Sequence, residues 1–204
     1  DVVLEDDAGK QTVGPFAIAR YPVTHCQFQA FVDAPDGYRA ETWWHDLERQ
    51  EPVAARWTER NAPRETVSWY EAVAFCRWLS DRLGYAVRLP TEFEWQQAAT
   101  GGDGRTYPWG TEWAEGYCNS AESALDRTTA VGVYPHATWS GGPLDMAGNV
   151  FEWCLNKHDD PTHYVIDRSG DGRVLRGGSW YYGSDNCRAA CRGYSHPGLR
   201  SDDL

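Results

Sequence analysis

The sequence predicts an α+β domain, with two main helices in its first half and short strands and long loops in its second half. Before Gly101, apolar residues recur at helical spacing. After Gly101 the chain is rich in Gly, Pro, Asn, Ser and Trp, and no long periodic run follows. We expect a single domain at 14–204, preceded by an acidic and polar linker or tail at 1–13. Since the first residue is not Met, we expect this domain to be part of a longer chain.

The strongest helical pattern lies in SWYEAVAFCRWLSDRLGY, at residues 68–85. Ser68 and Glu71 form a capping box, and Gly84 suits the left-handed position that ends a helix. The predicted apolar stripe consists of Ala72, Phe75, Cys76 and Leu79. These signals predict one helix of about four turns.

The second main helix is predicted in TEFEWQQAAT, at residues 91–100. Thr91 is its expected N-cap, and Glu94 follows three residues later, as a capping box requires. A shorter helix is predicted after Thr24, which is also a suitable N-cap. One face of that helix carries Phe28, Phe31 and Val32.

Two stretches of the first half predict strands. In GPFAIARYPVT, at residues 14–24, Phe16, Ile18 and Arg20 would point to one face. AVRLP, at residues 86–90, reads as a shorter strand. Residues 35–66 contain Pro, Gly and several aromatic residues and predict a long irregular segment.

The charge of the chain limits its partners. Its net charge is −11, with 19 Lys and Arg against 30 Asp and Glu. Nucleic-acid binding needs clustered positive charge, so we expect no nucleic-acid partner. No run of about 18 apolar residues occurs, so no membrane span is predicted.

The cysteines are scattered, without a CxxC pair, which disfavours a zinc ribbon or a thioredoxin motif. They are also too sparse for a disulfide scaffold, and we interpret most of them as buried free thiols. These thiols and the missing leader favour the cytoplasm, although the compartment is otherwise unknown. The six are Cys26, Cys76, Cys118, Cys154, Cys187 and Cys191.

Five segments in this order carry a resemblance to a known family: YPVTHCQFQAFV, VSWYEAVAFCRWLSDRLGYAVRLPTEFEWQQAATGG, YPWG, GPLDMAGNVFEWC and RVLRGGSW. Together they resemble the formylglycine-generating-enzyme, or sulfatase-modifying factor, type of domain. The resemblance covers about residues 14–204. It implies a C-type-lectin-like fold, which agrees with helices first and loops later.

The resemblance also implies where an oxidase would hold its catalytic copper. The family's enzymes use two cysteines shortly after the RGGS motif, with four residues between them, and soft thiolates suit Cu(I). Counting forward, the first position falls on Tyr182 and the second on Cys187. A sulfoxide-synthase branch uses iron held by histidines, but the six histidines here show no HxxxH spacing, and HxxE spacing occurs only once, at His45 and Glu48. We therefore predict no catalytic residue and no catalytic cofactor.

A structural calcium site is predicted in LDMAGNVFEW, at residues 144–153. Calcium takes six to eight oxygens from carboxylates and carbonyls. The resemblance implies side-chain ligands at Asp145 and Glu152 and carbonyl ligands at Gly148 and Val150. A second family site matches the segment around Asn119. The alternative is that both carboxylates cap turns and pair with Arg.

The composition of the last 24 residues points to a displayed surface. None of residues 181–204 is Glu, Lys, Gln, Met or Trp, whereas residues 1–180 contain 33 of these five types. About four would be expected at that frequency. The resemblance implies a reason, because one branch of the family consists of variable proteins of diversity-generating retroelements. Adenine-directed changes of Asn codons rewrite the segment after RGGSW and cannot produce those five residues.

Within this segment we expect a fixed framework made of CRAA at 187–190, Arg192, Pro197 and Arg200. Tyr gives a large contact at low entropic cost, and Ser, Gly and Asn adapt to a partner. The predicted variable, ligand-binding positions are Tyr181, Tyr182, Gly183, Ser184, Asp185, Asn186, Cys191, Gly193, Tyr194, Ser195, His196, Leu199, Ser201, Asp202 and Asp203.

We therefore predict a monomeric ligand-binding variable protein of a diversity-generating retroelement, and not an enzyme. The ligand is unknown, but a face of about fifteen exposed residues suits a protein better than a small molecule. Two alternatives stay open. One is an oxidoreductase of the formylglycine-generating or sulfoxide-synthase type, and the other is an undiversified interaction domain of a signalling protein.

Overall fold

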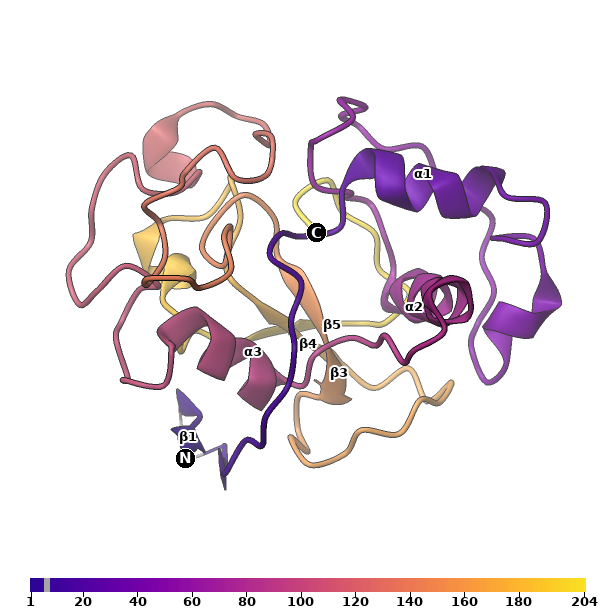
Figure 1. Ribbon diagram of the computed structural model, residues 1–204, viewed down its shortest axis with the longest axis horizontal. Coiled ribbons are helices and arrows are strands. Elements are labelled where there is room, and N and C mark those ends of the chain that lie inside the picture. The colour runs from indigo at the N-terminus through magenta and orange to yellow at the C-terminus, as the bar shows by residue number, and fades with distance from the viewer. Residues whose placement is uncertain (6–7) are drawn as a thin grey trace.

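The computed structural model describes residues 1–5 and 8–204 and has the predicted α+β layout (Figure 1). Its three α-helices all precede Gly101, and a three-stranded antiparallel sheet lies in the second half. The helices are α1 (His25–Asp33), α2 (Trp69–Leu83) and α3 (Glu92–Thr100). The strands of this sheet are β3 (Glu152–Lys157), β4 (Arg173–Arg176) and β5 (Gly193–Ser195).

The sheet runs through the middle of the molecule in the order β3-β4-β5 (Figure 1). All four residues of β4 are buried, because β4 is the central strand and α3 contacts both β3 and β4. Trp153 of β3 faces Leu175 of β4, whereas Lys157 faces Arg173, so the register shifts between these pairs. The sheet thereby joins the second half of the chain to α3.

The predicted caps of the two main helices are present. The Ser68 N–H donates to the Glu71 carboxylate at 2.8 Å, and the Glu71 N–H donates back to the Ser68 hydroxyl at 3.3 Å. Thr91 and Glu94 form the same box at the start of α3. Gly84 ends α2 with φ of 71°, in the left-handed region that favours glycine.

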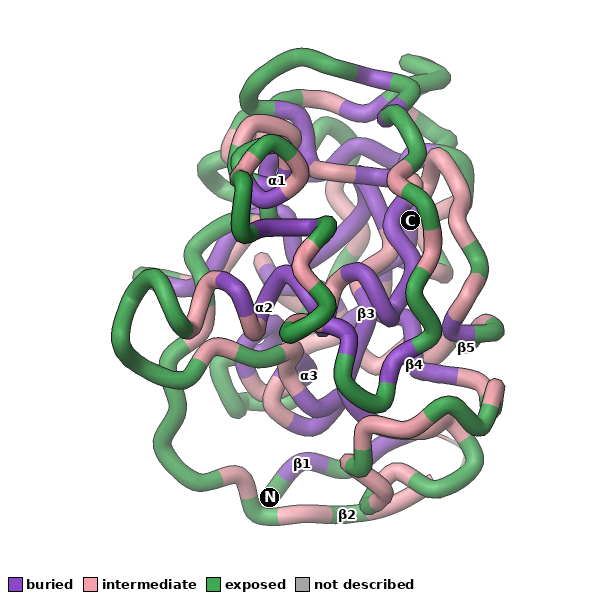
Figure 2. Tube along the Cα trace, turned by 90° about the vertical axis from the view of Figure 1, so that its right-hand side faces the viewer, coloured by how far each residue is buried: buried purple, intermediate pink, exposed green. Residues whose placement is uncertain are grey.

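The buried face of α2 is broader than the predicted stripe (Figure 2). Phe75 and Cys76 are buried as expected, but Ala72 and Leu79 are only partly buried. Trp69 and Val73 are buried as well. The helix is therefore covered on more than one side.

Aromatic residues hold the long irregular segments in place. Trp69 lies fully buried in α2, and its indole N–H donates to the carbonyl of Cys154 at 2.9 Å. The indole N–H of Trp44 donates to the carbonyl of Tyr38 at 2.7 Å. Each ring thus buries apolar area while its indole N–H satisfies a carbonyl, that of Cys154 in β3 for Trp69 and that of Tyr38 in an irregular segment for Trp44.

The two strands predicted in the first half are absent among the described residues, so this prediction was wrong. Residues 14–23 are mostly exposed, and only Thr24 makes an isolated bridge, to Pro63. In the 86–90 stretch, the Val87 N–H donates to the Ser80 hydroxyl rather than to a neighbouring strand. Alternation predicted the extended shape, but no partner strand completes it.

The segment at 1–13 was expected to be a linker or tail, but its described residues pack on the domain. Strand β1 (Val2–Val3) pairs with β2 (Lys10–Gln11). Val2 and Leu4 are buried against Phe93 of α3. Residues 6–7 lie outside the described part of the chain. The limits of the domain remain a prediction.

Candidate ligand-binding surface and candidate cation site

All fifteen predicted variable positions are exposed or partly buried. Tyr181 is 66% exposed and Tyr194 is 63% exposed. In contrast, Cys187, Ala189 and Pro197 of the predicted framework are buried between them. The segment therefore alternates between exposed side chains and buried anchors.

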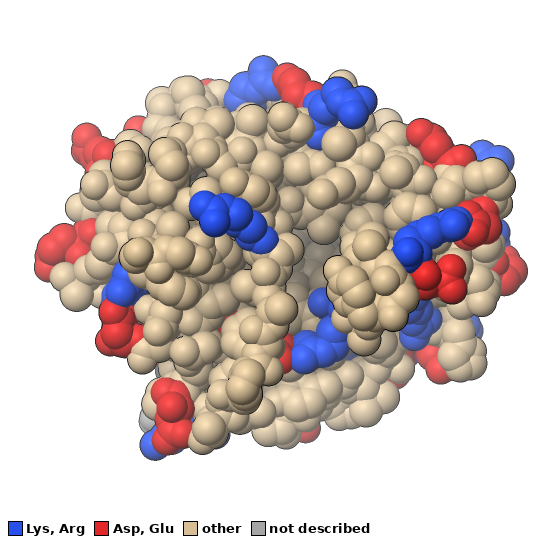
Figure 3. Space-filling view, viewed as in Figure 1, with Lys and Arg blue, Asp and Glu red and all other residues tan. Residues whose placement is uncertain are grey.

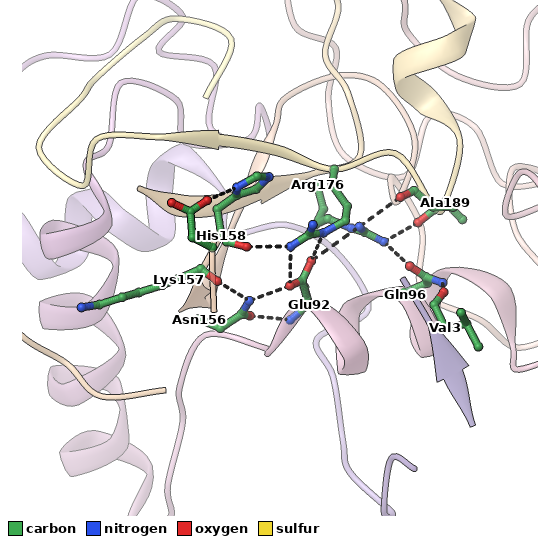
Figure 4. A network of polar contacts seen from close by, with 11 residues as sticks. Val3, Glu92, Gln96, Asn156, Lys157, His158, Arg176 and Ala189 are labelled. Atoms are coloured by element: carbon green, nitrogen blue, oxygen red, sulfur yellow. Dashed lines mark hydrogen bonds and ion pairs between the residues drawn. The ribbon is translucent and has the colours of Figure 1, made fainter. Parts of the chain in front are cut away.

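Arg192 anchors the segment to α3. Its guanidinium donates to both carboxylate oxygens of Glu92, at 2.7 and 3.0 Å. Glu92 is fully buried and also accepts from the amide of Asn156 at 2.8 Å (Figure 4). Arg176 lies 3.8 Å from the same carboxylate. Two guanidiniums and an amide thus satisfy one buried charge.

Arg200 makes the corresponding anchor to α2. Its guanidinium donates to the Glu71 carboxylate at 2.7 Å and to the carbonyl of Glu51 at 2.9 Å. The Tyr38 hydroxyl donates to the same carboxylate at 2.6 Å. Burial, and then the charge of Glu71, raises the pKa of Tyr38 above its ordinary value.

The two ends of the segment meet at one group of exposed residues. Tyr181 packs edge to face on Trp180, and Tyr182 packs in the same way on Phe151, at 5.4 Å between ring centroids. The Trp180 indole N–H donates to the carbonyl of Asp202 at 3.2 Å. Tyr181 and Tyr182 therefore lie next to the last residues of the chain.

A second group forms around β5. The ring of Tyr194 lies 4.3 Å from that of His158, between centroids. Gly172 lies directly against the Tyr194 ring, and Gly170 lies against the His196 imidazole. The contacts thus gather the predicted positions into more than one group along the segment.

The two positions at which an oxidase of this family would hold copper, 182 and 187, lie in different surroundings. Tyr182 presents a partly exposed phenol, whereas Cys187 is fully buried. Cys187 belongs to a buried cluster with Cys118, Tyr107 and Ala147. The Cys118 thiol beside it, together with burial, raises the pKa of Cys187. Sequence reasoning missed Cys118 as its neighbour, because no spacing rule connects the two.

The predicted calcium ligands lie on a tight turn before β3 and, in the case of Glu152, on the first residue of β3. Burial raises the pKa of Asp145 to about 6, although the backbone N–H of Gly132 donates to its carboxylate at 2.6 Å. Burial also raises the pKa of Glu152 to about 7, and the charge of Asp145 adds to this rise. The Glu152 carboxylate accepts from the Trp95 indole N–H at 3.0 Å. Both donors are neutral, so within the described residues neither carboxylate is paired with Arg.

Asn149, which sequence reasoning did not single out, organises this turn. Its side-chain oxygen accepts from the N–H of Thr129 at 2.9 Å and from the amide of Asn119 at 3.2 Å. Gly148 has φ of 70°, and an added Cβ would lie 2.3 Å from the carbonyl oxygen of Asn119. Only glycine fits there, so the two predicted calcium segments are locked together at this point.

On the face drawn in Figure 3, Lys and Arg occur in separate groups, most of them beside Asp or Glu, and positive charge is not concentrated in one patch. In residues 1–5 and 8–204, no cluster of three or more His, Cys, Asp or Glu is suited to hold a metal ion. No helix in that same part of the chain is long and apolar enough to cross a bilayer.

The proteins with similar sequences include two enzymes and one inactive enzyme homologue. The chain is 32% identical to hercynine oxygenase of Mycolicibacterium thermoresistibile, over 91% of this chain and 48% of that protein. It is 32% identical to the formylglycine-generating enzyme of Streptomyces coelicolor, over 93% of this chain and 76% of the enzyme. It is 30% identical to the inactive Cα-formylglycine-generating enzyme 2 of Bos taurus, over 95% and 76%. The chain spans about half the length of hercynine oxygenase.

Among solved structures, Treponema denticola variable protein 1 is similar, with a TM-score of 0.67 and 27% identity. The match covers 90% of this chain and 80% of that protein. This similarity confirms the C-type-lectin-like fold that the motifs implied. Because the model of the FGE-sulfatase family matches residues 5–204, the chain belongs to this family, the sulfatase-modifying factor enzyme 1-like domains.

Proposed function

We propose that this domain is a ligand-binding variable protein, whose C-terminal segment displays residues diversified by a retroelement. One observation carries the proposal. The fifteen positions expected to vary are exposed or partly buried, whereas the framework residues Cys187, Ala189 and Pro197 between them are buried. A diversified surface needs this separation, because exposed side chains change at little cost whereas buried ones do not.

Residues outside the variable positions hold the backbone of the segment. The Ala189 N–H donates to the carbonyl of Thr106 at 2.8 Å, and its carbonyl accepts from Arg176 at 2.6 Å. Arg192 and Arg200 add the buried ion pairs to Glu92 and Glu71. Side chains can therefore be exchanged at the exposed positions without removing these contacts.

The exposed residues suit a protein ligand. Tyr181, Tyr182 and Tyr194 present three phenols that offer wide, rigid contact with little loss of entropy. The similarity to Treponema denticola variable protein 1, at 27% identity, supports the assignment to variable proteins.

A folding-tolerance experiment tests a requirement of this function. One library randomises the fifteen variable positions, and a matched library randomises the anchors Cys187, Ala189, Arg192, Pro197 and Arg200. Display level together with protease resistance reports the folded fraction. We expect most members of the first library to fold and most members of the second to fail. Equal failure of both libraries would overturn the proposal.

Calcium is the structural cofactor that we propose for the turn before β3. The turn supplies the buried Asp145 and the first residue of β3 supplies the partly buried Glu152, and the charge of Asp145 raises the pKa of Glu152. A hard divalent cation bound by these oxygens would neutralise both charges, with the carbonyls of Gly148 and Val150 as further ligands. Its role would be to hold the turn, and no chemical step is assigned to it.

An oxidoreductase is the second candidate, favoured by the matches to two enzymes and by one contact. Cys118 supplies a second sulfur beside Cys187, which the spacing within the C-terminal segment did not. Stoichiometric Cu(I) binding that is lost in Cys187→Ser, together with oxidation of a cysteine peptide, would establish this function. An undiversified interaction domain of a signalling protein is the third candidate, and the coding DNA distinguishes it.

A further inference from the structure

A pocket of about 340 Å³ lies beside the start of the variable segment, between the 113–125 loop and Tyr134. Its edge is formed by the short helix η3 (Ala121–Ser123), which contacts the segment directly. The Ala121 N–H donates to the carbonyl of Tyr182 at 3.0 Å. The Glu122 carboxylate accepts from the N–H of Ser184 at 2.7 Å, at the start of η4 (Ser184–Cys187). The pocket therefore borders the start of the variable segment.

The pocket carries unbalanced negative charge. Glu115 and Glu122 both line it, and none of its lining residues, all within the described part of the chain, is Lys or Arg. Burial alone would raise the pKa of Glu122, but hydrogen bonds from Ser120 and Ser184 outweigh burial and lower it. Glu122 therefore stays ionised at neutral pH, and its carboxylate is held at the edge of the pocket.

An aromatic wall completes the pocket. Trp113 lines it and is fixed by edge-to-face packing on Tyr107, at 5.3 Å between ring centroids, and by Trp109 at 5.8 Å. Tyr134 also lines the pocket. A cation placed over an indole face gains electrostatic attraction, and a guanidinium gains stacking as well. The volume suits one side chain better than a large cofactor.

We propose that this pocket is a fixed anchor site that binds a cationic side chain, an arginine or a lysine, of the protein ligand. None of its lining residues belongs to the fifteen predicted variable positions. The pocket would thus contribute the same contact in every variant, while the neighbouring segment changes. One part of this inference, that the cation belongs to the ligand of the variable segment, rests on the proposed function. Recognition of the cation itself does not depend on it.

Small probes test the pocket without a known ligand. Nα-acetyl-arginine methylamide and the lysine analogue are titrated into ¹⁵N-labelled protein, and the indole N–H signal of Trp113 is followed by NMR. Nα-acetyl-citrulline methylamide is the control for arginine, because it has the same shape without the charge. We expect saturable binding of a cationic probe, about tenfold or more tighter than binding of citrulline.

Matched protein variants locate the effect. We expect Glu122→Gln to weaken binding about fivefold or more, and Glu112→Gln, which removes the same charge outside the pocket, to change it less than about twofold. Equal binding of citrulline, binding of methyl α-mannoside at Trp113 instead, or no saturable shift would overturn the anchor site. The folding-tolerance libraries are independent of these probes, so failure of one experiment does not imply failure of the other.

Discussion

Arg192 in the C-terminal segment and Glu92 at the start of α3 form a buried, two-pronged ion pair, with N–O distances of 2.7 and 3.0 Å. The side chain of Glu92 is fully buried, and that of Arg192 is 8% exposed. Tyr194, two residues further along the chain, is 63% exposed. One residue of the segment thus anchors the backbone, and its neighbours remain available for contact.

Arg192→Ala is expected to lower the free energy of unfolding by about 3 kcal/mol, because it leaves a buried carboxylate without its main partner. Urea denaturation measures this change. Arg168→Ala, at an exposed arginine, is the control and should shift stability by less than about 0.5 kcal/mol. Similar small effects for both variants would mean that Arg192 is not an anchor.

Trp180 and Tyr181 are adjacent in the chain, but their truncation to alanine should lower the free energy of unfolding by very different amounts. Tyr181 is 66% exposed, so Tyr181→Ala should cost less than about 0.5 kcal/mol. Trp180 is 8% exposed and packs on Trp57, so Trp180→Ala should cost about 3 kcal/mol. Thermal unfolding of the two variants compares them directly, and a large loss for Tyr181→Ala would contradict a displayed role.

Acid should remove the contribution that Asp167 makes to the free energy of unfolding. Burial would raise its pKa, but hydrogen bonds from Ser169 and Lys157 and the charge of Arg173 hold it below its ordinary value. A depressed pKa stabilises the folded state above the unfolded pKa of about 4, and this contribution is lost as pH falls further. The stability difference between wild type and Asp167→Asn should therefore shrink between pH 5 and pH 2. Asp81→Asn, at an exposed aspartate, should show no such trend.

Calcium should stabilise protein previously treated with EDTA. The cation would neutralise Asp145 and Glu152, and a ligand at a hundredfold its Kd stabilises the folded state by about 2.7 kcal/mol. The melting temperature should rise with Ca²⁺, less with Mg²⁺, and more at pH 8 than at pH 5, because the carboxylates must lose their protons. Asp145→Asn should abolish the response. An unchanged melting temperature in wild type would remove the calcium site.

The helices could be predicted because their signals are local. The Ser68–Glu71 and Thr91–Glu94 boxes and the left-handed Gly84 depend only on residues near one another in the chain. Local signals did not decide whether residues 14–24 form a strand. A strand needs a partner strand, and an alternating pattern does not specify one. After Trp180, the fifteen positions expected to be exposed are exposed or partly buried, and of the expected framework Cys187, Ala189 and Pro197 are buried. Their role in ligand binding stays a prediction.

Contacts between distant segments were not predictable from spacing. Cys118 meets Cys187, and Arg200 meets Glu71, only because the folded chain brings their loops together. The pocket at Trp113 and Glu122 likewise has no motif of its own, since its wall depends on ring packing and its carboxylate is held by Ser184. Such sites require the three-dimensional structure.

Diversification of positions between 181 and 203 would leave a trace in the DNA around the coding region, and sequencing that region reveals it. We expect a near-copy of the stretch that encodes residues 181–204, beside a reverse transcriptase gene. The copy should differ from the coding stretch only where it has adenine, and these differences should fall in codons of the exposed positions while those of Cys187, Arg192, Pro197 and Arg200 stay unchanged. A complete flanking sequence without such a copy, or with differences spread over all bases, would mean that the segment is not diversified by a retroelement.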